Sequence, residues 1–132
     1  MKITADTNIL VRAATLDDPV QGAVAQKLMK QAETVAVTLP ALCEFCWVLG
    51  RVYRYESARV AASIRFLIDA ENIAVDRQAV EAGLAVLDEG GDFADGLIAH
   101  EGQWLGGETF VSFDREAVGL LKKQGHDALI PK

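Results

Sequence analysis

The stretch Lys2-Ile3-Thr4-Ala5-Asp6-Thr7-Asn8-Ile9-Leu10-Val11 predicts a strand, an acid at its end, and a helix. Residues 2–5 predict a short buried strand that ends at the acid Asp6, and residues 8–14 predict a helix. Ligands of a parallel sheet bind beyond the carboxyl ends of its strands, and Asp6 occupies such a position. The alternative role for this acid is a helix N-cap, but Asn8 is a second candidate for that cap.

Short strands and helices alternate along the rest of the chain. Strands are expected over residues 34–39, 72–75, 109–112 and 128–130. Helices are expected to begin at Asp18-Pro19, Pro40 and Ser57 (the last as an N-cap), to include residues 80–87, and to cover 92–105 and 115–123. This order predicts an α/β fold of three layers, with a mainly parallel sheet of four to five short strands flanked by helices. The length of 132 residues predicts a single domain over residues 1–132.

Composition limits the classes of function. The chain has 13 basic and 19 acidic residues, a net charge of −6, and a pI near 4.8. This charge argues against a protein that binds nucleic acid through a generally basic surface. An enzyme that gathers acids in one place to hold a metal ion remains compatible with this charge.

Three features predict a cytoplasmic protein without a membrane segment. The two cysteines, Cys43 and Cys46, cannot form a disulfide framework and are expected to be small buried residues. Asp6 precedes any apolar run that could serve as a signal peptide. The longest mostly uncharged run, residues 35–50, is too short for a bilayer and is interrupted by a proline and an acid.

Glu44 is the only charged residue in that run. A lone carboxylate among apolar neighbours is unfavourable to bury without a partner, and a metal ion would be a suitable partner. The alternative is a surface position on an amphipathic helix. The neighbours Cys43, Phe45, Cys46 and Trp47 favour burial.

Three more acids lie at the starts of expected helices. Asp92 is expected to be an N-cap, and Asp95 lies three residues later in the same first turn. Asp114 follows the strand around residues 109–113, and an N-cap is its alternative role. Acids from four separate segments could meet at one edge of the sheet: Asp6, Glu44, Asp95 and Asp114. Such a cluster would repel itself unless it held Mg²⁺ or Mn²⁺, and it suits hydrolysis by phosphoryl transfer.

Four motifs together resemble the PIN-domain family, and most closely the VapC-type toxins of bacterial toxin–antitoxin pairs. They are Asp6-Thr7-Asn8-Ile9-Leu10-Val11, Glu44 in its apolar helix, Asp92-Phe93-Ala94-Asp95-Gly96-Leu97-Ile98-Ala99, and Ser112-Phe113-Asp114. The resemblance runs along the whole chain in order and spacing. It implies a PIN-like fold and a Mg²⁺- or Mn²⁺-dependent endoribonuclease that a VapB-type antitoxin holds inactive.

The resemblance also implies roles for particular residues. Asp6, Glu44, Asp95 and Asp114 are the implied catalytic and metal-binding acids. Implied accessory residues are Thr7, Asn8, Asp92, Ser112 and Glu116. Gly96 stands where alanine is frequent in the family, and its lower helix propensity, about 1 kcal/mol, is expected to loosen Asp95.

Basic and aromatic residues of the chain are candidates for contacts with partners. Arg12, Arg51 and Arg54 are candidates for contacts with an RNA substrate, although solvated surface positions are their ordinary role. The aromatic residues of region 40–69 predict a homodimer, with simple core filling as the alternative. Two other functions stay open: a non-catalytic binding module with the same fold, and a phosphatase-like α/β hydrolase. The phosphatase is disfavoured because residue 8 is Asn instead of a second acid.

Overall fold

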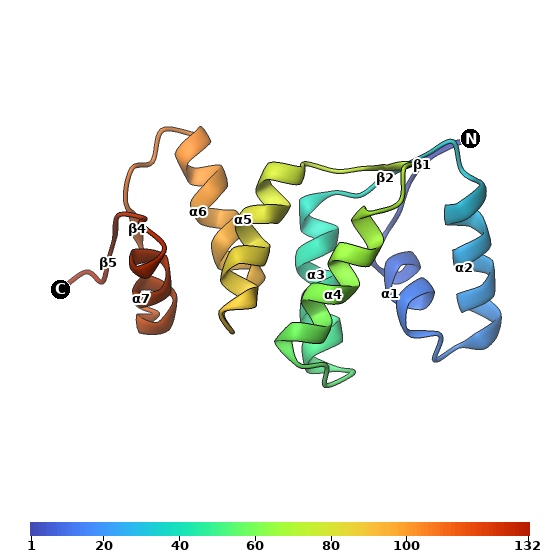
Figure 1. The fold of residues 1–132 in the computed structure, drawn as a ribbon, viewed down its shortest axis with the longest axis horizontal. Helices are drawn as coiled ribbons and strands as arrows, with labels where there is room; N and C mark the ends of the chain where they lie inside the picture. The colour runs from blue at the N-terminus through green and yellow to red at the C-terminus, as the bar shows by residue number, and fades with distance from the viewer. The chain divides into compact units, whose positions relative to one another are not determined.

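The computed structural model describes residues 1–132, which fold as two compact units (Figure 1). The first unit is Met1–Asp76 and the second is Arg77–Lys132. Each unit has its own strands, helices and buried side chains.

The first unit contains a three-stranded parallel sheet in the order β1-β2-β3. Ile3 lies opposite Val35, and Val35 lies opposite Ile73. Its elements are β1 (Lys2–Thr4), α1 (Thr7–Thr15), α2 (Pro19–Gln31), β2 (Thr34–Ala36), α3 (Leu39–Arg51), α4 (Ser57–Ile68) and β3 (Ile73–Ala74). In Figure 1, α1 packs beside α2 and α3 packs beside α4.

Side-chain caps fix where two of these helices begin. Asp18 accepts a hydrogen bond from the amide of Gln21 at 3.0 Å, and Pro19 is the first residue of α2, as the sequence predicted. Thr38 caps α3 by accepting from the amide of Ala41 at 3.3 Å. The expected cap at Ser57 is wrong, because Glu56 holds the N-cap position of α4 and its side chain makes no capping bond.

The core of the first unit lies where the buried face of α3 meets its neighbours. Leu42, Phe45 and Leu49 on α3 are buried, and so are Val35 on β2 and Ile64 on α4. The spacing of the three α3 residues places them on one face of the helix. The position of α3 is therefore determined by this apolar face.

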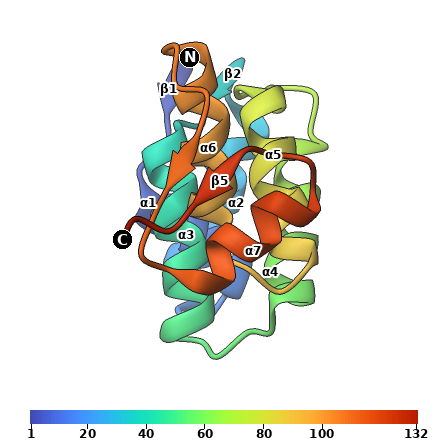
Figure 2. The same cartoon turned by 90° about the vertical axis from the view of Figure 1, so that its left-hand side faces the viewer.

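The second unit contains two short parallel strands with a helix between them in the chain. Its elements are α5 (Arg77–Asp88), α6 (Phe93–Trp104), β4 (Phe110–Val111), α7 (Arg115–Lys123) and β5 (Ala128–Leu129). Phe110 pairs with Ala128 and Val111 with Leu129, and Figure 2 shows β4 and β5 side by side. The bounds of α7 are those expected from the sequence.

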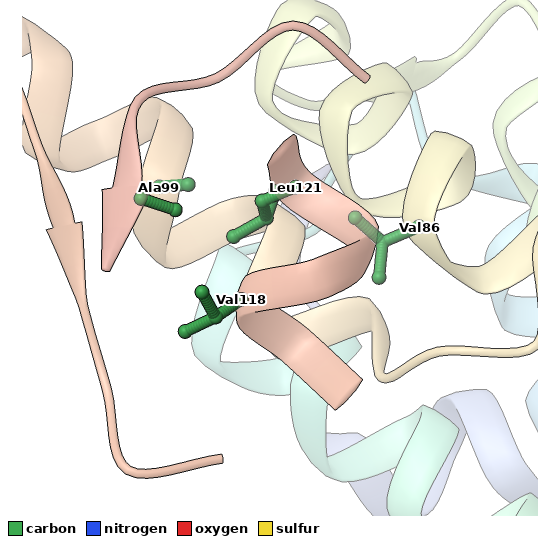
Figure 3. Packing of buried hydrophobic residues seen from close by; sticks show 5 residues of the cluster. Val86, Ala99, Val118 and Leu121 are labelled. Atoms are coloured by element: carbon green, nitrogen blue, oxygen red, sulfur yellow. The ribbon is translucent and has the colours of Figure 1, made fainter. Parts of the chain in front are cut away.

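Helix α7 is held by a small apolar cluster. Figure 3 shows its residues Val118 and Leu121 with Val86 of α5 and Ala99 of α6. Ala128 of β5 completes the buried set. In addition, the Gln124 side chain donates to the carbonyl of Ala85 at 2.9 Å. These contacts fix α7, and with it the residues at its N-terminus, on α5 and α6.

The predicted fold class is confirmed. Seven helices accompany five short strands, and every strand pair is parallel. Three strands belong to the first unit and two to the second. The longest helices have 13 residues, and none is long and apolar enough to span a bilayer.

Candidate active site

The second unit has an acid-lined cleft of about 630 Å³ between the start of α6 and the start of α7. Four of the acids named from the sequence line it: Asp92, Asp95, Asp114 and Glu116. The cleft thus brings together two members of the predicted quartet, Asp95 and Asp114, and two of the predicted accessory acids.

The first turn of α6 presents two of these carboxylates. Asp92 is the N-cap of α6, as expected, and accepts from the amide of Ala94 at 3.0 Å. Asp95 lies in that first turn and is half-buried. Burial raises the pKa of Asp95 above its usual value, and the nearby charges of Asp92 and Asp114 raise it further. Asp95 is therefore a carboxylate whose charge would be stabilised by a cation.

Close packing of α6 on α5 holds Asp95 in place. A Cβ atom on Gly96 would overlap the carbonyl oxygen of Ala82 and would come within 2.9 Å of the Cα of Gly83. Gly83 in turn leaves room for the ring of Phe93, which a Cβ there would meet at 2.6 Å. The expectation that Gly96 loosens Asp95 is wrong. The missing side chain lets the helix carrying Asp95 approach α5 closely.

Asp114 has a structural role in addition to its place in the cleft. Its Oδ1 accepts from the amides of Glu116 at 3.0 Å and Ala117 at 3.2 Å, so it is the N-cap of α7. The hydroxyl of Ser112 accepts from the Asp114 amide at 3.0 Å. The capping bonds leave Oδ2 for another ligand, so the two roles proposed for Asp114 are compatible.

In the first unit, Asp6 lies two residues after the end of β1. It holds the N-cap position of α1, but its side chain makes no capping hydrogen bond and is exposed. Asn8 lies within the helix and is also exposed. The neighbouring Thr7 has a buried hydroxyl oxygen without a hydrogen-bond partner. The side-chain oxygens of Asp6 and Thr7 thus make no hydrogen bond within the local fold.

Glu44 lies on α3, and the sequence argument about its burial is wrong. The side chain is exposed, and so is Trp47 one turn further along, at 60%. The apolar residues that fill the core are Leu42, Phe45 and Leu49 on another face of the helix. Exposure removes the need for a buried counter-charge, while leaving the carboxylate accessible as a ligand.

Metal binding is chemically compatible with the cleft of the second unit. Neither unit, taken by itself, holds a group of three or more His, Cys, Asp or Glu residues arranged for a metal ion. Mg²⁺, however, keeps several waters and commonly binds through one or two carboxylates. Asp95 and Asp114 supply that number of carboxylates. Burial, followed by the charges of Asp92 and Asp114, raises the pKa of Asp95, and a nearby cation would favour its ionised form.

The three arginines expected to contact RNA differ in their surroundings. Arg12 donates to Gln21 at 2.9 Å and to Asp17 at 3.1 Å, so it ties α1 to the loop and helix that follow. Arg51 and Arg54 are exposed at the connection between α3 and α4. The sequence did not distinguish the structural arginine from the two exposed ones.

Sequence reasoning missed two charged residues of the cleft, Glu89 and Arg115, while Lys123, a candidate phosphate contact from the sequence, also lines it. Arg115 was detectable in principle, because it directly follows Asp114 and begins α7. Lys123 lies two turns further on the same helix. Their cationic side chains lie at the edge of an otherwise acidic cleft, where they are able to attract a phosphate group.

A family model described as the PIN domain matches residues 3–120. The match covers most of the chain, including parts of both units, and the chain belongs to the PIN domain family. This family has a nuclease fold whose members typically depend on divalent metal ions, which indicates a hydrolase-type enzyme acting on nucleic acid. The comparison with curated proteins found no match.

Proposed function

We propose that this protein is a metal-dependent endoribonuclease, and that it is a VapC-type toxin. The observation that carries the proposal is the meeting of Asp95 and Asp114 at one cleft, where burial first, and then the charges of Asp92 and Asp114, raise the pKa of Asp95. Membership of the PIN family supplies the class of reaction. Helix capping accounts for the placement of Asp92 and Asp114, but a stability role does not account for Asp95, whose ionised form both of these charges oppose.

The proposed site contains four acids: Asp6, Glu44, Asp95 and Asp114. Both acids of the first unit are exposed, and the side chain of Asp6 makes no capping hydrogen bond although it holds the N-cap position of α1. Helix α1 follows Asp6, and helix α3 carries Glu44. These two helices pack together, and each begins after the carboxyl end of a strand of the β1-β2-β3 sheet. We further propose that residues 1–132 act as one domain, because the family model spans residues of both units.

The chain's own acidic side chains would hold and position the metal ion in the proposed site. We propose Mg²⁺ as the cofactor, with Mn²⁺ as a substitute. Asp95 and Asp114 of the cleft would bind it, Asp92 and Glu116 add negative charge, and Asp6 and Glu44 are the further acids that the proposal assigns to it. When bound, such an ion lowers the pKa of water and neutralises charge on the phosphodiester. Asp114 is kept in position by its cap and by Ser112, and the hydroxyl of Thr7 is available for a further hydrogen bond.

Control by a VapB-type antitoxin follows from the same charges. An arginine inserted by the antitoxin could pair with two carboxylates and exclude both metal and RNA. The net charge of −6 would speed association with a basic segment. Such a toxin would act in the cytoplasm, where its RNA substrate and antitoxin are present.

A metal-dependence assay tests the proposed function. The purified chain should cleave RNA in Mg²⁺ or Mn²⁺ and lose that activity in excess EDTA. Asp95→Asn should remove most of the activity because it keeps the side-chain shape but loses the charge. Glu101→Gln, an exposed acid on the same helix, is the matched control and should behave as the unchanged protein. Full activity of the chain in EDTA would disprove metal dependence.

A further inference from the structure

The turn between α3 and α4 concentrates arginine and tyrosine in an otherwise acidic chain. Residues 51–59 read Arg51-Val52-Tyr53-Arg54-Tyr55-Glu56-Ser57-Ala58-Arg59, and we call them the basic turn. The turn has three arginines and one acid, a local charge of +2 (3 − 1), against −6 for the whole chain. Arg51, Arg54 and Arg59 are all exposed.

Hydrogen bonds and ring contacts make the basic turn rigid. The amide of Tyr55 donates to the carbonyl of Leu49 at 3.0 Å. The hydroxyl of Tyr53 donates to Asp17, which also pairs with Arg12. The rings of Tyr53 and Tyr55 meet edge to face with centroids 6.2 Å apart. A rigid surface loses little conformational entropy when it binds a ligand.

Two of the arginines are held in unusual ways. The guanidinium carbon of Arg59 lies 3.8 Å from the centroid of the Tyr55 ring. Stacking uses the face of the guanidinium, while the N–H donors lie in its plane and remain suited to phosphate. Arg54 has a φ of 60°, in the left-handed region that is unfavourable for a residue with a Cβ atom. Glycine or asparagine would fit that backbone better, so local stability does not explain an arginine there.

We propose that the basic turn is a docking surface for the phosphate backbone of single-stranded RNA, with Arg51, Arg54 and Arg59 as phosphate ligands. The inference rests on the proposed ribonuclease function and adds a substrate contact outside the acidic cleft. The acidic side chains of the cleft repel RNA, so in a chain of net charge −6 a cationic surface outside the cleft would add to the attraction that Arg115 and Lys123 supply. Arginine and tyrosine side by side are the residues that bind single strands without sequence preference.

The test compares two double variants of equal net charge. Arg51→Gln with Arg54→Gly, and Lys27→Gln with Lys30→Gln, each change the charge from −6 to −8 (−6 − 2). Lys27 and Lys30 are exposed on α2 in the same unit. Fluorescence anisotropy measures binding of a labelled single-stranded oligoribonucleotide in EDTA over a series of KCl concentrations. A denaturing gel checks that the RNA stays intact.

We expect the arginine variant to bind RNA about tenfold more weakly, with a salt slope smaller by about 0.7 per arginine removed. The lysine variant should bind as the unchanged chain does. Arg54→Gly alone should raise the melting temperature while lowering RNA affinity, because glycine relieves the left-handed backbone. These opposite effects would show that weaker binding does not come from unfolding.

Three outcomes would overturn the docking surface. They are equal losses of RNA affinity in both double variants, no loss of RNA affinity in either, or an arginine variant that keeps its RNA affinity but loses binding to a protein partner. Failure of the proposed function is a separate result. If the intact chain binds RNA through the basic turn but never cleaves it in Mg²⁺ or Mn²⁺, the docking surface stands and the nuclease proposal fails. If the chain cleaves RNA and the arginine variant binds RNA normally, the nuclease proposal stands and the docking surface fails.

Discussion

Gly96 on α6 packs directly against the backbone of Ala82 on α5, and the carbonyl carbon of Ala82 lies 2.9 Å from where a Cβ atom would stand. Backbone atoms of a helix cannot move aside as the end of a flexible side chain can. The residue just before Gly96 is Asp95, so this close approach also sets the position of a proposed metal ligand.

Gly96→Ala should therefore destabilise the protein, although alanine is the better helix former. We expect a loss of about 1–3 kcal/mol in the free energy of unfolding, as for other overpacked sites. Gly102→Ala on the same helix is the matched control, because no heavy atom lies within 4 Å of the added Cβ. It should gain about 0.5–1 kcal/mol. Urea unfolding of both variants measures the difference, and equal stability would contradict close packing at Gly96.

The raised pKa of Asp95 predicts a pH dependence of stability in the absence of metal. The folded carboxyl binds its proton more tightly than the unfolded one, whose pKa is near 3.8. As the pH rises from that value through the raised pKa, the unfolded state ionises first and the free energy of unfolding falls. Asp95→Asn removes this fall and should be more stable than the unchanged protein at neutral pH in EDTA.

Urea unfolding over a pH series in EDTA checks the sign, with Glu101→Gln as the control variant. Mn²⁺ should reverse the effect, because the unchanged protein gains stability from the ion and Asp95→Asn gains much less. A stability that rises with pH over the same range, and is unaffected by Asp95→Asn, would show that the neighbouring carboxylates do not repel Asp95.

Asp114 offers a way to separate a helix cap from a metal ligand. Asn is as good an N-cap as Asp, so Asp114→Asn should keep the bonds to Glu116 and Ala117 and the stability of α7. Asp114→Ala loses the cap and should cost about 1 kcal/mol. Both variants should bind Mn²⁺ much more weakly by titration calorimetry. If Asp114→Asn kept the full Mn²⁺ affinity, Asp114 would be a cap alone.

Features that depend on neighbouring residues in the chain were predictable. Asp18 before Pro19 marked the start of α2, and the charged and apolar pattern of α7 gave both of its ends. The start of α4 was predicted less well. Serine is a common cap, but here Ser57 begins the helix and Glu56 precedes it without a capping bond. Local propensity alone does not decide between two adjacent residues.

Features that depend on packing between helices were not predictable. Glu44 lies among apolar letters, yet only one face of α3 is buried, and Trp47 is exposed beside it. Gly96 was judged by its helix propensity, whereas contact with α5 decides its role. Likewise, Arg12 and Arg54 look alike in the sequence. Only the structure shows Arg12 bonded to Asp17 and Gln21, and Arg54 at the exposed turn.

Exposed aromatic residues on α3 and α4 predict a homodimer. Trp47 on α3 and Phe66 on α4 are 60% and 87% exposed, and these two helices pack beside each other. Large exposed aromatic side chains are typical of the centres of protein interfaces. We therefore expect a dimer through α3 and α4.

In a two-fold dimer each substituted residue occurs on both sides of the interface, so the effect of a substitution is doubled. Trp47→Ser with Phe66→Ser should give a monomer by light scattering at tens of micromolar. Trp104→Ser, which changes a 76% exposed tryptophan in the second unit, should leave the dimer intact. An unchanged protein that is itself a monomer at that concentration would refute the prediction, and dissociation by Trp104→Ser alone would assign the interface to the second unit instead.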